Sequence, residues 1–580
     1  MTENRNFVVA ILLSALVLFG WTMLGDKLFP KPATPPAATS VAKGDATAAG
    51  APGAPGLPEA AKPRAVGAVL AESGRILVET PKVKGSISLK GARFDDLILP
   101  HHTISLDPKS GPVRILSPEG TEHSQFASFG WTGSGAAFPN TETVWQASDS
   151  KLTPTTPVTL SWDNQQGQIF QIKISVDKDY MFTAEQSVTN KGAAPIAVRP
   201  YGFINRGYAT VGKSSTLAGP RHDVDSWTIH VGPIGTFDNA TNYSVNYPDL
   251  DTAGPKGQRF KSTGGWLGFG DTYWLTAMAP AQTAHMDAGF RKGNGTYQAD
   301  YALDNVVVAP GQSNSAQTHF FAGAKEVPVL DGYMDNLGIQ LFGNAIDWGW
   351  FKMFAKPIFY LLDSLFKLVK NFGVAIILLT LIVKGVMFPI AQRQFASMAA
   401  MRVVQPKVKE IQERYKDDRP KMQQAMMELY QKEKINPMAG CLPIFIQIPV
   451  FYALYKVLLL TIEMRHQPFA LWIKDLSAPD PLTPVNLFGL LHFTPPSFIA
   501  LGVLPILLGI TMYIQFKLNP APADPVQQQV FSIMPWIMMF LMAPFAAGLQ
   551  LYWVVNNLLT IAQQKFLYSR HPAMKAPIKT

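Results

Sequence analysis

Long apolar runs separate the parts of the chain that can cross a membrane from those that cannot. Residues 371–391, 441–462 and 497–516 carry at most one charge each, and a helix of ~20 residues matches the roughly 30 Å hydrocarbon layer of a bilayer. Residues 525–564 carry no charge at all. A single helix of that length would measure roughly 60 Å, so we predict two spans, 529–547 and 548–566, with a turn near Pro544–Gly548.

The first 64 residues predict a membrane anchor followed by a linker. Residues 7–25 are uncharged, and this run is longer than the roughly 7–15 apolar residues of a cleaved signal peptide. We therefore expect residues 1–25 to form an uncleaved signal-anchor helix, which brings the total to six spans; a cleaved leader is the alternative. Residues 26–64 are rich in Ala, Pro and Gly, which indicates a semi-extended linker.

Residues 65–330 show the period of two that is typical of β-strands. Phe170, Ile172 and Ile174 alternate with polar residues, and turn signals such as Asn190–Gly192 recur along the segment. This pattern predicts a large extracytoplasmic β-sandwich. Residues 344–370 have apolar residues at helical spacing interrupted by charges, which predicts an amphipathic helix at the outer membrane interface. An ordinary helix packed on the β-domain is the alternative.

The distribution of Lys and Arg orients the predicted spans. Residues 392–440 hold ten of these side chains and residues 463–496 hold two, and positive charge favours the cytoplasmic side. We predict that 392–440, 517–528, 567–580 and both termini are cytoplasmic. Residues 26–370 and 463–496 are then periplasmic, in a bacterial inner membrane. The net charge of +9 is therefore better explained by orientation in a membrane than by nucleic-acid binding. The chain has a single cysteine, Cys441, so it cannot form an internal disulfide.

Lys384 is the first candidate for function, because a charge inside a membrane helix is costly. Two interpretations stay open. The side chain lies about 14 Å from Arg393 along a helix and could extend toward the cytoplasmic interface. Alternatively it faces a water-filled cavity between helices, which other polar residues in the spans favour. These residues are Thr380, Gln447, Gln515, Gln550, Asn556 and Asn557.

The basic segment 392–440 predicts two antiparallel amphipathic helices joined at Asp417–Arg419. Methionines recur on their apolar faces, so the helices either only pack on each other or offer an adaptable surface to apolar partners. Elsewhere, Gly207–Ser214 fits a phosphate-binding loop, but the residues after it are a poor helix start, so we expect no nucleotide site. We also predict no cofactor and no metal site, since neither Arg221–Asp225 nor His101–His102 has a second ligand cluster fixed by the sequence.

Several stretches together resemble the YidC/Oxa/Alb family of membrane protein insertases, in the form found in Gram-negative bacteria. They cover the region from about residue 345 to 570, and the anchor and β-domain agree in position. The matching stretches are Thr380–Pro389, Gln405–Lys407, Lys434–Pro443, Gln447–Pro449, Pro468–Ser477, Asp524–Pro525 with Gln527 and Gln528, and Gly548–Trp553.

The resemblance implies a five-helix insertase bundle in an all-α membrane core, with the signal-anchor helix and a β-sandwich similar to the family's supersandwich. It implies an insertase and chaperone, not an enzyme, with a cationic groove open to cytoplasm and lipid. The groove cation is usually arginine in the family; here it is Lys384, which keeps the charge but not the planar fork. The implied groove residues are Lys384, Thr380, Gln447, Gln515, Asn556, Trp553 and Tyr552.

The resemblance also implies partners. The helical hairpin would recruit substrates, through Met398, Met401, Arg402, Met422 and Met426. The implied partners are nascent membrane proteins, the Sec translocon with its accessory subunits, the ribosome or signal recognition machinery at the cytoplasmic loops, and membrane lipids. No sequence-specific nucleic-acid binding is implied.

Two other functions remain as rivals at this point. A solute transporter would need a pathway open to both sides, and the spans show neither paired charges nor repeated halves. A tethered extracytoplasmic enzyme, perhaps one acting on carbohydrates, would need paired carboxylates in a cleft of the β-domain.

Overall fold

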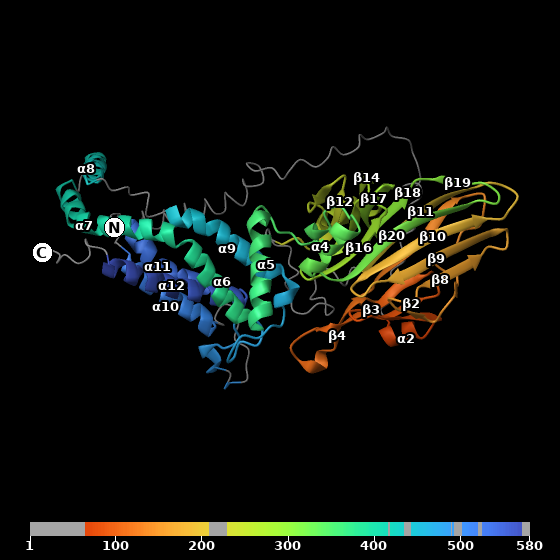
Figure 1. The fold of residues 1–580 in the computed structure, drawn as a ribbon, viewed down its shortest axis with the longest axis horizontal. Helices are drawn as coiled ribbons and strands as arrows, with labels where there is room; N and C mark the ends of the chain where they lie inside the picture. The colour runs from red at the N-terminus through yellow and green to blue at the C-terminus, as the bar shows by residue number, and fades with distance from the viewer. Residues whose placement is uncertain are drawn as a thin grey trace.

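The computed structural model has a β-rich part and a helical part at opposite ends of the molecule (Figure 1). The structure describes residues 64–207, 229–415, 418–433, 442–488, 490–491, 501–519 and 525–570. The predicted signal-anchor helix, nearly all of the linker, Arg221–Asp225, and all but the first residue of Gly207–Ser214 lie outside these ranges.

Within the described ranges the β-rich part contains two sheets, in which the pairing is antiparallel except between β1 and β7. The first has the order β14 (Gln258–Thr263), β17 (His285–Gly293), β18 (Thr296–Leu303), β11 (Ile196–Gly207), β5 (Gln125–Ser134), β3 (Arg93–Thr103), β2 (Lys84–Ser88), β1 (Arg75–Glu79) and β7 (Lys151–Leu152), with β19 (Val306–Val308) beside β11 and β4 (Pro112–Leu116) beside β3. The second has the order β13 (Ala240–Asn242), β12 (Gly232–Phe237), β15 (Trp266–Gly270), β16 (Trp274–Pro280), β20 (Ser313–Ala324), β10 (Met181–Asn190), β9 (Gln168–Val176), β8 (Val158–Asp163) and β6 (Gln146–Ala147).

Aromatic side chains join the two sheets face to face. Phe94 of the first sheet meets Phe182 and Phe320 of the second edge-on, with ring centroids 5.5 and 5.4 Å apart. The predicted alternation in β9 is confirmed, because Phe170, Ile172 and Ile174 are fully buried, whereas the polar residues that alternate with them, Gln171, Lys173 and Ser175, are at least partly exposed. The core of the β-rich part therefore lies between the sheets, as the sequence predicts for a sandwich.

The helical part begins with α4 (Val327–Asn336), which follows the last strand and extends past the predicted domain boundary at residue 330. A 3₁₀ turn, η4 (Phe342–Ala345), then precedes α5, so the amphipathic helix begins at Lys352 and not at residue 344. In Figure 1, α5 runs across the bundle helices. The remaining helices are α5 (Lys352–Val369), α6 (Phe372–Val386), α7 (Phe388–Arg414), α8 (Arg419–Lys432), α9 (Leu442–Leu460), α10 (Val503–Leu518), α11 (Pro525–Met542) and α12 (Ala547–Arg570). Two short helices, α2 (Val66–Leu70) and α3 (Tyr247–Ala253), accompany the sheets.

The helix after residue 371 is bent where the sequence predicts a straight span. It ends at Val386, and α7 starts at Phe388 with Pro389 in its first turn. Proline has no N–H to continue the helical ladder, so the two helices meet at 59°. Within the described ranges no single helix has both the length and the apolar composition to cross a bilayer, whereas α6 joined to Phe388–Ala396 across this bend has both.

The uncharged run from 525 to 564 turns where the sequence predicts. Helix α11 ends at Met542 and α12 begins at Ala547, so the turn covers residues 543–546. Helix α12 contacts α6, α7, α9 and α10, which places it in the middle of the bundle.

Polar contacts tie the β-rich part to the bundle just beyond the end of α9. Arg465 donates to the carbonyls of Thr103 and Ile104 at 2.9 and 3.1 Å, and its guanidinium lies over the Trp274 ring. Glu463, in the 3₁₀ turn η6 (Ile462–Met464), accepts the Val327 N–H at the start of α4 through Oε1 at 3.1 Å. Its second oxygen, Oε2, is buried without a hydrogen-bond partner in the described part of the chain.

Glu463 makes the stability of this junction depend on pH. Burial, with added repulsion from Glu326 and Asp363, raises the pKa of Glu463 to about 7 from 4.5. The folded protein therefore holds a proton that the unfolded chain loses, and this contribution to stability is full below pH 4.5 and is lost as the pH rises to about 7.

We predict that Glu463→Gln removes this pH dependence. At one pKa unit per about 1.4 kcal/mol, the variant gains roughly 3 kcal/mol over the wild type between pH 4.5 and pH 8. Thermal unfolding of the purified protein at both pH values measures the difference in Tm. Glu185→Gln, at an exposed position of β10, is the control. An unchanged difference between wild type and Glu463→Gln at the two pH values would contradict the prediction.

Candidate functional site

The five apolar helices α6, α9, α10, α11 and α12 contain no Asp or Glu. Their cations are Lys384, Lys456, Lys517, Lys565 and Arg570. Lys456 is neutralised from outside the bundle, because Asp347 accepts from its ammonium with the backbone carbonyl at 2.9 Å and with Oδ2 at 3.4 Å. Lys384 lies near the end of α6 and has a different partner.

Lys384 lies between two helices and is partly buried. Its Nζ donates to Thr560 Oγ1 of α12 at 2.9 Å. Among the residues that the structure describes, no carboxylate lies within ion-pair distance of Lys384. The ammonium is thus held by a neutral hydroxyl, which orients the group without cancelling its charge.

One face of α12 forms the wall opposite Lys384. Trp553, Asn556 and Thr560 follow one another at intervals of three and four residues, which puts them on the same side of the helix. Thr560 Oγ1 donates to the Asn556 carbonyl at 2.7 Å. This bond fixes the orientation of the hydroxyl, whose oxygen accepts from Lys384 Nζ. The Trp553 ring meets Phe451 of α9 edge-on at 5.1 Å, and its indole N–H has no hydrogen-bond partner within the described ranges.

A second face of α12 carries polar groups with a different task. Gln550, Asn557 and Gln564 are spaced seven residues apart and are buried. The Gln550 amide donates to the carbonyls of residues 542, 543 and 545 that close the turn after α11, at 2.8–3.2 Å. Asn557 donates to Thr511 of α10, and Gln564 donates to the Leu518 carbonyl at the end of α10. Gln550 and Asn557, which the sequence groups with the polar residues that favour a cavity, are therefore engaged in helix packing.

The remaining predicted groove residues are distributed around this wall. Thr380 is buried, and its hydroxyl donates to the Ile376 carbonyl of its own helix at 2.7 Å. Tyr552 is buried in the apolar core, whereas Gln515 is partly exposed on α10. Gln447 belongs to α9, but its side chain lies outside the described atoms. The geometry thus joins Lys384, Thr560 and Asn556, and it adds Thr560, which the sequence could have pointed to as the fourth residue after Asn556.

The hairpin helices α7 and α8 extend away from the bundle (Figure 1). Phe395 of α7 meets Tyr568 of α12 edge-on at 5.9 Å, and Lys407 pairs with Glu433 just after α8 at 2.6 Å. Met401, Met422 and Met426 are partly buried, and the side chains of Met398 and Arg402 lie outside the described atoms.

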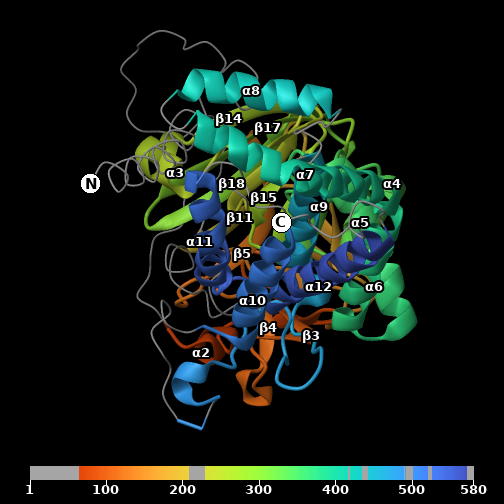
Figure 2. The ribbon, with the colours of Figure 1, turned by 90° about the vertical axis from the view of Figure 1, so that its left-hand side faces the viewer.

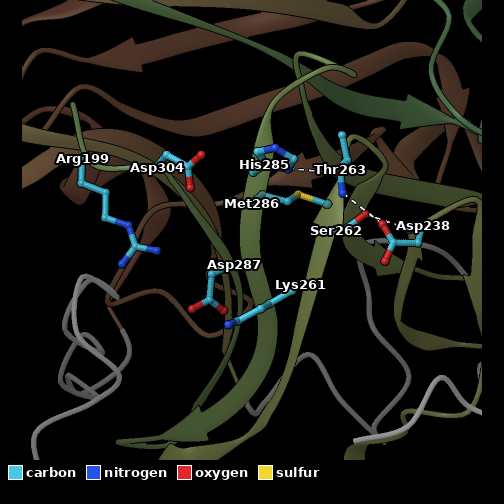
Figure 3. Close-up of a pocket in the computed structure, with 9 residues that line it drawn as sticks. All are labelled: Arg199, Asp238, Lys261, Ser262, Thr263, His285, Met286, Asp287 and Asp304. Carbon is cyan, nitrogen blue, oxygen red and sulfur yellow. Dashed lines mark hydrogen bonds between the residues drawn. The ribbon is translucent and has the colours of Figure 1, made fainter. Parts of the chain in front are cut away.

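The β-rich part has an open hollow of about 460 Å³ on strands β14 and β17 (Figure 3). Its carboxylates are already engaged in part, since Asp238 accepts the Thr263 N–H and Asp287 accepts from Arg259. This arrangement provides no pair of free, facing carboxylates of the kind that glycoside hydrolysis needs. The lining residues are Arg199, Asp238, Lys261, Ser262, Thr263, His285, Met286, Asp287 and Asp304.

Comparison with known proteins assigns the chain to a family. The family model described as the YidC periplasmic domain matches residues 75–361, and the model described as 60Kd inner membrane protein matches residues 364–575. The chain is 50% identical over 574 residues to the membrane protein insertase YidC of Zymomonas mobilis, with 98% of this chain and 96% of that protein covered. The chain belongs to the YidC family of membrane protein insertases.

Other YidC relatives agree over nearly the whole length. Identity to the insertase of Rhizobium meliloti is 44% over 590 residues, with 98% of this chain and 96% of that protein covered. Among solved structures, the chain is similar to an active YidC insertase with its first transmembrane domain resolved, at a TM-score of 0.35 and 18% identity, covering 85% of this chain and 92% of that one. The β-rich part is similar to a galactose mutarotase-related enzyme from Lactobacillus acidophilus, at a TM-score of 0.28 and 10% identity, covering 43% of this chain and 97% of that one.

Family membership fixes the broad function and setting. Members of the YidC family are inner-membrane proteins with a periplasmic domain, and that domain is the β-rich part of this chain. The relatives are named as insertases, so the function of the family is the insertion of membrane proteins and not the catalysis of a reaction. The resemblance found in the sequence is thereby confirmed.

We predict that the two polar faces of α12 respond differently to mutation. Gln550→Leu removes the side-chain donor to the carbonyls of residues 543 and 545, and it leaves the Met542 carbonyl with only the Phe545 N–H. An unsatisfied buried polar group costs about 1–3 kcal/mol, so the Tm of the purified protein should fall. Gln515→Leu is the control, because its amide makes no hydrogen bond in the described part of the chain. Equal Tm values for the two variants would show that the Gln550 contacts do not hold the α11–α12 turn.

Proposed function

We propose that Lys384 is the cation of a hydrophilic groove that receives the polar flank of a membrane protein during insertion. The observation that carries this proposal is the contact between Lys384 and Thr560 inside a bundle whose apolar helices contain no carboxylate. A cation left without a counter-charge in a low-dielectric setting attracts acidic groups of a passing chain. Trp553 and Asn556 supply an aromatic surface and further polar groups on the same wall.

The physical task of an insertase explains why such a groove is useful. Transfer of an apolar helix into lipid is favourable by about 25 cal/mol per Å² of buried apolar surface. The obstacle is the polar flank, for which each unsatisfied group costs several kcal/mol in hydrocarbon. A wet, cationic groove that reaches partway across the bilayer lowers this barrier, so short flanks need no nucleotide energy.

The proposal includes a topology. Six spans would place both termini and the hairpin α7–α8 in the cytoplasm, with residues 26–370 in the periplasm. Ten Lys and Arg in residues 392–440, against two in 463–496, support this orientation. Helix α5, with Trp350 before it exposed by 81% and Met353 by 74%, would lie at the periplasmic interface.

The partners that we propose come from the family resemblance. The methionine-bearing hairpin would receive nascent membrane proteins, together with the ribosome or signal recognition machinery. The periplasmic domain would contact accessory subunits of the Sec translocon, so that insertion proceeds alone or together with Sec.

We predict that insertion depends on the charge at position 384. In liposomes with a short single-span substrate, Lys384→Ala should lower the insertion rate on the order of tenfold, which corresponds to about 1.4 kcal/mol, while Lys384→Arg should retain it. Protease protection of the substrate measures insertion.

The matched control is Lys565→Ala, which removes an exposed cation from α12, the helix that carries Thr560. Equal insertion by the wild type and Lys384→Ala would remove Lys384 from the mechanism and leave it as a side chain that extends to the interface. If both Lys384→Ala and Lys565→Ala lost insertion, the activity would depend on the net positive charge of the protein and not on a cation in a groove.

A further inference from the structure

The segment before α10 is apolar well ahead of the helix itself. No Asp, Glu, Lys or Arg occurs between Asp480 and Lys517, although α10 begins only at Val503. We call the described residues of the first part of this run, 481–488 and 490–491, the apolar lip. A loop that lies in water has no need of such a composition.

The lip exposes large apolar side chains at its tip. Leu487 and Phe488 are 53% and 55% exposed, and Leu490 is 77% exposed. The blue segment around the 3₁₀ turn η7 (Pro484–Asn486) projects from the lower edge of the molecule in both views (Figures 1 and 2). Along the long axis of Figure 1 it lies close to the level of α5.

The backbone of the lip holds these side chains outward in an unusual conformation. Leu487 and Phe488 have φ values of 51° and 58°, in the left-handed region that residues with bulky side chains rarely adopt. Two consecutive residues in this region turn the chain sharply, and both side chains are more than half exposed. This backbone conformation costs free energy, and here it occurs in a segment whose apolar side chains are exposed. Such strain is often found at functional positions, so it points to a role for the tip of the lip.

The backbone of the lip is also hydrogen-bonded within itself. The N–H groups of Leu487, Phe488 and Leu491 donate to the carbonyls of residues 484, 483 and 486 at 2.9–3.0 Å. Leu490 donates to the Leu487 carbonyl, and Val485 donates to the Thr483 hydroxyl. Hydrogen bonds within the segment lower the cost of moving its backbone into hydrocarbon, where no water replaces a missing partner.

A buried carboxylate fixes the base of the lip to the bundle. Asp480 Oδ2 accepts the Leu504 N–H in the first turn of α10 at 2.7 Å, and Oδ1 accepts from Leu482 N–H and the Trp472 indole. The Leu482 carbonyl accepts the Val503 N–H at 3.0 Å. The lip is therefore held at the start of α10, whose outer face continues the apolar surface with Leu507 and Ile510.

We propose that the apolar lip inserts into the acyl chains of the periplasmic leaflet and anchors the outer end of the bundle in lipid. The absence of formal charge, the hydrogen bonds that the backbone of the lip makes within itself, and the attachment to α10, on which Leu507 and Ile510 are also exposed, all fit hydrocarbon as its occupant. The proposal rests on the inner-membrane location of the family and on the proposed topology, which puts residues 463–496 on the periplasmic side, and not on the Lys384 groove, so its test does not use insertion activity.

The test uses a fluorophore at the tip of the lip. Cys441 is the single cysteine, so Cys441→Ser gives a background in which Leu490→Cys can be labelled. Val307→Cys is the control, because Val307 is 67% exposed and β19 lies at the end of the β-rich part away from the bundle (Figure 1). The labelled full-length proteins are reconstituted in phosphatidylethanolamine–phosphatidylglycerol liposomes and exposed to acyl-chain nitroxide lipids or to iodide.

We expect the label at position 490 to be quenched severalfold more by the nitroxide lipids than the label at 307, and to be shielded from iodide. Similar quenching at both positions by both agents would overturn the proposal. Shielding at 490 that appears only when a substrate polypeptide is added would also overturn it, since the occupant would then be protein and not lipid.

Discussion

The bundle depends on the requirement that polar groups inside it find partners within the protein, because hydrocarbon offers none. Helix α12 shows how this requirement is met. Its buried residues Gln550, Asn557 and Gln564 bind the end of α11, Thr511 within α10 and the end of α10, and their spacing of seven residues keeps them on one side of the helix. The turn between α11 and α12 and the end of α10 are both held by these amides.

The other side of α12 is free for function because the packing is already secured. Thr560 can accept from Lys384, since its own hydroxyl hydrogen is committed to the Asn556 carbonyl. Lys456, which is buried, and Lys384, which is partly buried, differ in how their charges are balanced. Lys456 forms an ion pair with Asp347 from the segment before α5. In the described part of the chain, Lys384 donates only to the Thr560 hydroxyl. The positive potential at Lys384 is therefore kept, whereas the one at Lys456 is cancelled.

The junction between the periplasmic domain and the bundle concentrates charged residues just beyond the end of α9. Arg465 binds carbonyls of β3 and the loop that follows it, and Glu463 binds the start of α4, so neighbouring residues reach two separate elements of the domain. Because the buried Glu463 has no cationic partner in the described part of the chain, we expect its ionisation to loosen this junction. The apolar lip lies in the same connection between α9 and α10. The link between the two parts thus contains both the polar junction and the candidate lipid anchor.

The sequence alone determined which of the described segments form strands and which form helices. Alternation in β9, the uncharged run that turns into α11 and α12, and the methionine-bearing pair α7 and α8 follow from local periodicity, which needs no knowledge of neighbours. The family also followed from the sequence, because the matching motifs are contiguous, and the same stretches named Lys384 as a candidate. The bend at Met387 was missed although Pro389 signals it, since a proline near a helix start also fits an unbroken span.

Only the tertiary structure decided what the polar residues in the spans do. Gln550, Asn556 and Asn557 look alike in the sequence, yet two of them hold helices together and one supports Thr560 beside Lys384. The sequence likewise did not separate the apolar lip from the loop 463–496 and the predicted span 497–516, because composition does not show which side chains are exposed. The physical reason is the same in each case: a polar group acts through its partner, and the partner comes from a distant part of the chain that folding brings into contact.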